Sequence, residues 1–119
     1  MATIPVTKDN FTKLIENNDT VFFDFWAPWC GPCRWFAPIY EKVAEEHPDV
    51  VFAKCNTEDQ PELAGALGIQ AIPTLMVFKG GIGSFNQPGA LPESAFVELV
   101  NKVKEVDIEE IKREVEREQ

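Results

Sequence analysis

One short apolar run leads directly into a pair of cysteines two residues apart. Residues 21–26 are rich in strand-forming side chains, and Cys30 and Cys33 follow with Gly31 and Pro32 between them. A strand that is apolar on both faces is typical of a sheet covered by helices on both sides. Pro32 favours the first turn of a helix, where a missing N–H costs nothing. The sequence therefore predicts a dithiol at the junction of a buried strand and a helix.

Helix and strand patterns alternate along the rest of the chain. Helical spacing is found in residues 11–15, 32–46, 62–67 and 96–103, and strand-like runs in residues 50–54, 74–78 and, more weakly, 82–88. Such alternation indicates an α/β fold with a mixed central sheet and helices on both faces. We expect Pro38 to kink the second helix. We expect the last strand at an edge of the sheet, because Pro88 cannot donate a ladder hydrogen bond.

The composition indicates one globular domain with a substantial core. The 119 residues are 45% hydrophobic and include nine Phe and three Trp. The net charge of −9 disfavours nucleic acids and anionic membranes as partners. Neither a secretory signal nor a membrane-spanning run is visible in the sequence. We therefore expect a cytoplasmic protein, in which a Cys-x-x-Cys pair is catalytic or metal-binding rather than structural.

The two cysteines can close into a disulfide and so exchange two electrons. Unpaired N–H groups and the dipole at a helix N-terminus lower the pKa of the Cys30 thiol. We expect Cys30 to be the more exposed thiol, which attacks a substrate disulfide, and Cys33 to be the shielded thiol that resolves the mixed disulfide. Two alternatives remain open, an inert pair and a zinc site completed by Cys55 and His47.

Asp24 is an anomaly in the buried strand. Burial would raise the pKa of its carboxyl group and keep it partly protonated near neutrality. Such a group can exchange a proton with Cys33 when that thiol attacks. The alternative is a structural carboxylate held only by Lys54 from the neighbouring strand.

Three further positions, Pro73, Trp29 and Cys55, could contribute to the site or to the core. Pro73 follows Ile72 just before a strand, and a cis bond there could expose the backbone of Ile72 to an extended substrate. An ordinary trans proline is the more frequent arrangement. Trp29 either forms an apolar wall beside the Cys30 sulfur or shields the site. Cys55 is expected to be a buried, small apolar side chain.

Together these motifs resemble the thioredoxin family over residues 3–104. The matching positions are Asp24, the run of residues 25–33, Pro38, Lys54, Ile72-Pro73-Thr74, Lys79-Gly80-Gly81 and Gly89-Ala90-Leu91. The resemblance implies a five-stranded mixed sheet flanked by four helices in residues 1–104, with a cis bond before Pro73. Gly31-Pro32 between the cysteines resembles the reducing branch of the family.

The resemblance also implies an activity and partners. It implies reduction of protein disulfides through Cys30 and Cys33, assisted by Asp24 and Lys54. The substrate site that it implies consists of Trp29, Gly31, Pro32, Ile72, Pro73, Gly89 and Ala90. Electrons would come from thioredoxin reductase, with NADPH and FAD bound only to that partner, so we expect a monomer that carries neither cofactor nor metal.

Three features depart from the family pattern. Residues 84–88 are less strand-like than is usual in the family. Trp35 places another tryptophan just after the cysteines and can alter the choice of partner. Residues 105–119 form a charged extension in which Asp107 is expected to cap a short helix whose Ile108, Ile111 and Val115 share one face. We expect this helix to pack on its own domain, and a partner or dimer contact is the alternative.

A second function is compatible with the same features. The chain could be a binding module in which the scaffold docks a partner through Trp29, Trp35 and the extension. Redox chemistry would then be incidental. Normal partner binding after replacement of both cysteines would favour this reading.

Overall fold

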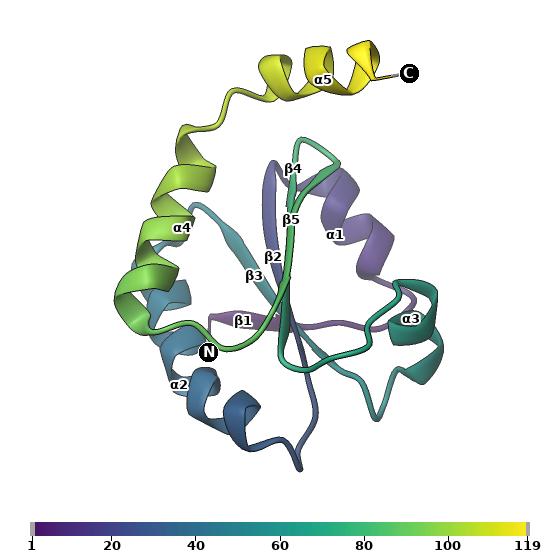
Figure 1. Cartoon of the computed structure of the whole chain (residues 1–119), viewed down its shortest axis with the longest axis vertical. Coiled ribbons are helices and arrows are strands. Elements are labelled where there is room, and N and C mark those ends of the chain that lie inside the picture. The colour runs from purple at the N-terminus through teal and green to yellow at the C-terminus, as the bar shows by residue number, and fades with distance from the viewer. Residues whose placement is uncertain (1, 119) are drawn as a thin grey trace.

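The computed structural model describes residues 2–118, which form five strands and five helices around one sheet (Figure 1). In chain order these are β1 (Thr3–Pro5), α1 (Phe11–Asn17), β2 (Thr20–Trp26), α2 (Gly31–Glu46), β3 (Val51–Asn56), α3 (Pro61–Ala66), β4 (Thr74–Lys79), β5 (Ile82–Pro88), α4 (Glu93–Glu105) and α5 (Ile108–Arg117). The predicted fold class and the alternation of elements are confirmed.

The sheet is mixed and has the strand order β1-β3-β2-β4-β5. β3 runs parallel to both β1 and β2, whereas β4 runs antiparallel to both β2 and β5. β2 is therefore the central strand, and β5 lies at an edge, as its proline predicts. β3 begins at Val51 rather than at Val50, because the Val50 N–H donates to the His47 carbonyl in the preceding turn.

Helices cover the sheet on both faces, with α2 and α4 on one side and α1 and α3 on the other (Figure 1). Successive side chains of a strand point to opposite faces, so β2 contributes Phe22 to one core and Phe23 to the other. Phe22, Tyr40 of α2 and Phe96 of α4 are fully buried together, and their rings contact one another or the Phe52 ring. Burial of β2 on both faces explains why its sequence is almost continuously apolar.

The start of α2 is fixed by the cysteines. Cys30 is the N-cap residue, and the Cys33 N–H donates to its sulfur at 3.2 Å. Farther along, Pro38 lies inside the helix, and the Tyr40 hydroxyl is 3.0 Å from the Phe22 carbonyl and 2.8 Å from the Ala53 carbonyl. This hydroxyl anchors α2 to the two central parallel strands.

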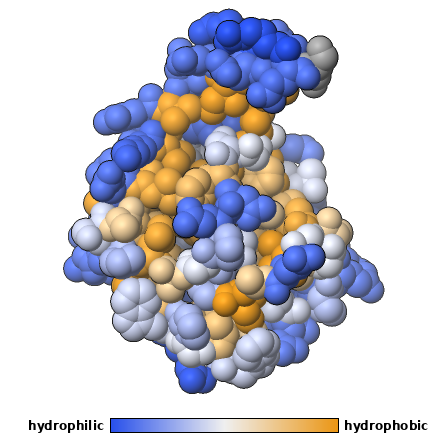
Figure 2. All heavy atoms as spheres, in the orientation of Figure 1, coloured by the Kyte–Doolittle hydropathy of each residue, from blue (hydrophilic) through white to orange (hydrophobic). Residues whose placement is uncertain are grey.

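The C-terminal extension forms α5, which is capped by Asp107 as the sequence predicts. The Asp107 side chain accepts a hydrogen bond from the Glu109 N–H at 2.9 Å. Figure 2 shows apolar atoms on the side of α5 that faces the body and hydrophilic atoms on its outer side. The contact with the domain is made by Ile108, whose side chain lies over Gly80 in the β4–β5 turn. Ile108, Ile111 and Val115 are half-buried and the other residues of α5 are exposed, which agrees with the expectation that this face packs on the domain.

Replacing Gly80 by alanine is expected to undock α5. The added Cβ would lie 2.6 Å from Cγ2 of Ile108, and Gly80 has a φ of +60°. Gly81 is a matched control, because its φ is +82° and nothing lies within 4 Å of an added Cβ. Both variants should lose roughly 1–2 kcal/mol of stability through the left-handed backbone. Only Gly80→Ala should accelerate amide hydrogen exchange in residues 108–117. Equal protection of α5 in the two variants would contradict the packing.

Candidate functional site

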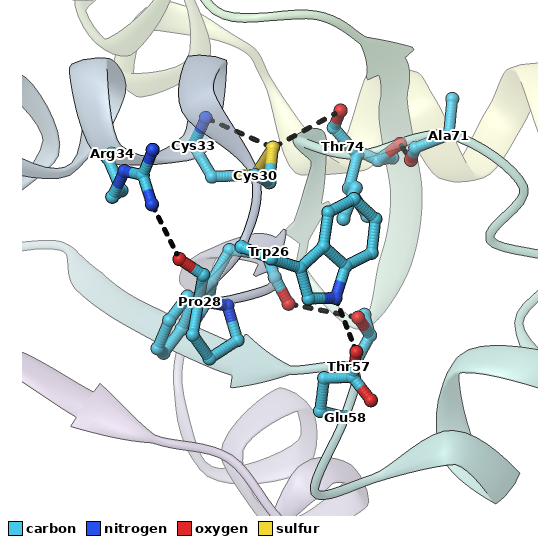
Figure 3. The surroundings of a disulfide bond; sticks show 11 residues. Trp26, Pro28, Cys30, Cys33, Arg34, Thr57, Glu58, Ala71 and Thr74 are labelled. Atoms are coloured by element: carbon cyan, nitrogen blue, oxygen red, sulfur yellow. Dashed lines mark hydrogen bonds between the residues drawn. A yellow bond between two sulfur atoms is a disulfide. The ribbon is translucent and has the colours of Figure 1, made fainter.

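The predicted dithiol is present as a disulfide between Cys30 and Cys33, with the two Cα atoms 5.2 Å apart. It lies where β2 ends and α2 begins (Figure 3). Since the Cys33 N–H points at Cys30 Sγ, a thiolate formed there would accept a hydrogen bond from the helix N-terminus. This geometry favours a low pKa for the Cys30 thiol in the reduced protein.

The expected contrast in exposure between the two cysteines is small. Cys30 is 5% exposed and Cys33 is 2% exposed, so both are buried. The prediction that Cys30 is the more exposed thiol and Cys33 the shielded one agrees with these values, but the difference between them is small. The reason is tertiary, because Ala27, Trp26 and Ile72 pack against the disulfide.

Asp24 is completely buried, as its position in β2 predicts. Burial raises the pKa of its carboxyl group from 3.8 to about 7, although the positive charge of Lys54 lowers it in part. Neither carboxyl oxygen has a hydrogen-bond partner among residues 2–118. The side chain lies on the face of β2 that also carries Phe22 and Trp26, and α2 covers this face. Among the described residues no hydrogen bond joins Lys54 to this carboxyl group, and Lys54 acts on it through its charge, which lowers the Asp24 pKa in part.

Lys54 is the partner of Asp24 across the β2–β3 pair. Its Nζ lies 5.1 Å from the centre of the Trp26 ring, a cation–π distance. Lys54 and Trp26 both line a cleft of about 550 Å³ between β1, α2 and the β3–α3 loop. The residue paired with Asp24 on the neighbouring strand therefore borders a cleft, whereas Asp24 itself is completely buried.

The Ile72–Pro73 peptide bond is cis, as the family resemblance implies and contrary to the ordinary expectation for an isolated proline. The Ile72 carbonyl oxygen lies 3.8 Å from Cys30 Sγ. The Gly89 N–H donates to the Pro73 carbonyl at 2.7 Å, and Gly89 has a φ of +106°. Two predicted substrate-binding segments, far apart in sequence, therefore meet beside the disulfide.

Trp29 is 66% exposed and lies on the surface beside the disulfide. Its indole N–H donates to the carboxylate of Glu58 in the β3–α3 loop. Arg34 donates to the Pro28 carbonyl at 3.2 Å (Figure 3). Glu58 and Arg34 are not among the residues that the sequence predicts for the site. Nothing local in the sequence links Glu58 to Trp29, since the two residues are 29 positions apart.

The structure separates the ligands of the alternative zinc site. Cys55 is fully buried on the α1–α3 face of the sheet, where burial raises the pKa of its thiol to about 11. His47 follows the last residue of α2, whereas Cys30 precedes the first, so the helix holds them roughly 25 Å apart. The Nδ1 atom of His47 instead contacts Lys104 Nζ at 2.7 Å. Cys55 is the buried apolar side chain that was predicted.

Comparisons with known proteins agree with this geometry. A sequence model of the family described as Thioredoxin matches residues 2–102. A putative thioredoxin 2 of Streptomyces coelicolor is 48% identical over 118 residues, which cover 99% of this chain and 88% of that protein. A chloroplastic M-type thioredoxin of Chlamydomonas reinhardtii is 43% identical over 82% of this chain and 71% of its own length. The solved structure of a Plasmodium falciparum thioredoxin superposes with a TM-score of 0.78 at 33% identity, covering 84% of this chain and 98% of that one.

A five-stranded mixed sheet with a Cys-x-x-Cys disulfide at the N-terminus of a helix defines the class of thiol–disulfide oxidoreductases with the thioredoxin fold. The chain belongs to the thioredoxin family. It acts on disulfides by dithiol exchange, and the binding-module alternative is not favoured. Among residues 2–118, no helix is long and apolar enough to cross a membrane.

The raised pKa of Asp24 predicts a specific dependence of stability on pH. Between about pH 3.8 and about pH 7 the folded protein keeps a proton that the unfolded chain has lost. The free energy of unfolding of the oxidised protein should therefore fall as pH rises through this window and level off above it. A shift of about three pKa units corresponds to at most about 4 kcal/mol.

Urea unfolding of wild type and Asp24→Asn at a series of pH values measures this effect. The variant should lack the decline and be the more stable protein above pH 7. Asp9→Asn, which changes an exposed carboxylate, should keep the wild-type profile. Identical profiles for wild type and Asp24→Asn would show that the carboxyl group titrates normally.

Proposed function

We propose that this protein reduces disulfide bonds in other proteins, with Cys30 as the attacking thiolate and Cys33 as the resolving thiol. The observation that carries this proposal is the hydrogen bond from the Cys33 N–H to Cys30 Sγ at the start of α2. It favours the thiolate at Cys30 and not at Cys33, because Cys33 lies inside the helix and no backbone N–H of residues 2–118 donates to its sulfur.

The first step is attack of the Cys30 thiolate on one sulfur of the substrate disulfide. A bond forms between Cys30 Sγ and that sulfur, and the other substrate sulfur leaves with the electron pair and takes up a proton. The Ile72 carbonyl beside Cys30 Sγ can accept a hydrogen bond from the backbone of an extended substrate. In this proposal the surface around Cys30 Sγ that receives the substrate consists of Trp29, Gly31, Pro32, Pro73, Gly89 and Ala90.

The second step releases the reduced substrate. Cys33 loses its proton and attacks Cys30 Sγ, so the mixed disulfide breaks and the second substrate thiol leaves. Asp24 accepts the Cys33 proton in this proposal, since a carboxyl group with a pKa of about 7 is matched to proton transfer near neutrality. Lys54 stabilises the resulting carboxylate from the neighbouring strand. The substrate has gained two electrons, and this chain again holds the Cys30–Cys33 disulfide.

The partners and the compartment complete the proposal. A thioredoxin reductase would return two electrons from NADPH through its FAD, while this chain itself uses only its disulfide. We propose a monomer that serves as an electron donor in redox homeostasis of a reducing compartment, the cytoplasm. The charge of −9 supports the absence of nucleic-acid and membrane partners.

Variants of the two cysteines test the assigned roles. Cys33→Ser should accumulate substrate proteins in covalent complexes through Cys30, because no thiol remains to resolve them. Cys30→Ser should trap none, since the remaining thiol is shielded. The measurement is non-reducing electrophoresis and mass spectrometry after incubation with oxidised protein substrates. Trapping by Cys30→Ser would reverse the two roles.

Asp24→Asn is expected to slow turnover without loss of folding. Resolution by Cys33 should become at least about tenfold slower near pH 7, because no internal base accepts the proton. The defect should shrink at higher pH, where solvent can deprotonate Cys33. The rate of release of the second substrate thiol in single-turnover kinetics measures this step. Unchanged release at pH 7 would eliminate Asp24 as the proton acceptor.

A further inference from the structure

Trp35 is an exposed indole that the proposed mechanism does not use. Its side chain is 54% exposed in the second turn of α2, two residues after Cys33. Among residues 2–118 the exposed large apolar side chains are Ile4, Trp29, Trp35 and Val106. The two exposed tryptophans therefore lie on either side of the cysteines in the sequence, Trp29 directly before Cys30 and Trp35 two residues after Cys33. Isolated exposed apolar side chains need no explanation, but two indoles beside one reactive bond indicate a contact surface.

The helical repeat places Trp35 on the flank of α2 that faces α4. Lys42 lies seven residues after Trp35, and positions seven apart in an α-helix differ in direction by only about 20°. Lys42 forms an ion pair of 2.8 Å with Glu93, the first residue of α4. Ile39, one turn after Trp35, packs against the core cluster that contains Phe96 of α4. Along the helix axis Trp35 is only about 3 Å from Cys33.

The same flank carries the Gly89–Ala90 segment of the substrate site. This segment directly precedes α4, and Gly89 is bonded to the Pro73 carbonyl. Trp29 lies on the opposite flank, where Glu58 of the β3–α3 loop holds its indole. A peptide lying over the disulfide therefore has one exposed indole on each side.

The two flanks differ in where their charged groups lie relative to the exposed indole, and this difference indicates what each can bind. The Trp29 flank carries the Glu58 carboxylate, and the Arg34 side chain is turned toward it through its bond to Pro28. On the Trp35 flank, residues 87–92 contain no charged side chain, and Lys42 and Glu93 neutralise each other. This flank is suited to an apolar side chain.

We propose that Trp35 determines substrate specificity by binding an aromatic or branched aliphatic side chain next to the substrate disulfide, on the α4 side. This inference rests on the disulfide-exchange function of the Cys30–Cys33 pair. Tryptophan buries a large, rigid apolar surface at low entropic cost and is enriched among residues that dominate binding. The interaction adds affinity for the polypeptide and leaves the chemistry of the dithiol unchanged.

Rates of disulfide reduction by the reduced protein test this proposal without any reductase. The probes are two synthetic peptides whose single cysteine carries a thionitrobenzoate disulfide, one flanked by Phe and Leu and the other by Ser. The small, non-aromatic bis(2-hydroxyethyl) disulfide is the third probe. Wild type should reduce the apolar peptide about tenfold faster than the serine peptide, a ratio in the range that one buried aromatic side chain supplies.

Trp35→Ala should lower this ratio about fivefold or more, while its rate with the small disulfide stays within about twofold of wild type. Trp35→Phe should retain most of the preference, because an aromatic ring remains. Arg34→Ala is the matched control, since it changes the adjacent exposed side chain that points to the other flank, and it should keep the ratio.

Three results would overturn the inference. An unchanged ratio in Trp35→Ala would show that Trp35 does not contact the peptide. An equal loss of reduction rate with all three probes in Trp35→Ala would show that Trp35 acts on the dithiol itself. Failure of the reduced wild type with every probe would instead refute the disulfide-exchange function, and the inference with it.

Discussion

The structure depends on the burial of β2 on both faces of the sheet. Four of the other elements, two helices on each side, pack on side chains that alternate along this strand, and its two neighbours pair with it over six residues each. The end of such a strand is held with little freedom. The chain that leaves it, residues 27–30, therefore delivers Cys30 to a fixed place at the N-terminus of α2. The Tyr40 hydroxyl donates to carbonyl groups of β2 and β3 and so fixes the position of α2 relative to these two strands.

The same burial produces the chemistry of the site. A carboxyl group in the middle of β2 loses its hydration and keeps a proton to about pH 7. An amide at the start of α2 stabilises negative charge on Cys30. One strand–helix junction thus supplies the dithiol and, in the mechanism that we propose, the group that accepts the Cys33 proton. Ile72, Pro73 and Gly89 meet beside this junction, and in our proposal they form the surface that receives the substrate backbone.

Specificity is separated in space from this chemistry. The groups that set the reactivity of the dithiol are buried or face the interior, whereas Trp29 and Trp35 are exposed on its two flanks. An exposed side chain can change without loss of the core or of the thiolate. Members of one family can therefore share a reaction and differ in the proteins that they reduce. The extension that forms α5 lies at the opposite end of the sheet, over the β4–β5 turn, and does not contact the disulfide.

The sequence by itself determined the type of almost every element, the edge position of β5, the burial of Asp24 and Cys55, and the dithiol at the start of a helix. These features depend on local pattern, proline chemistry and side-chain polarity, which one segment is enough to reveal. Only the tertiary structure decided the near-complete burial of Cys30 and the hydrogen bond from Trp29 to Glu58. It also decided the contact of Ile108 with Gly80 and the separation of His47 from the cysteines. Each of these joins, or keeps apart, residues whose distance is set by how the helices and loops pack on the sheet. No local pattern encodes such a distance, because the same short segment can meet different neighbours in different folds.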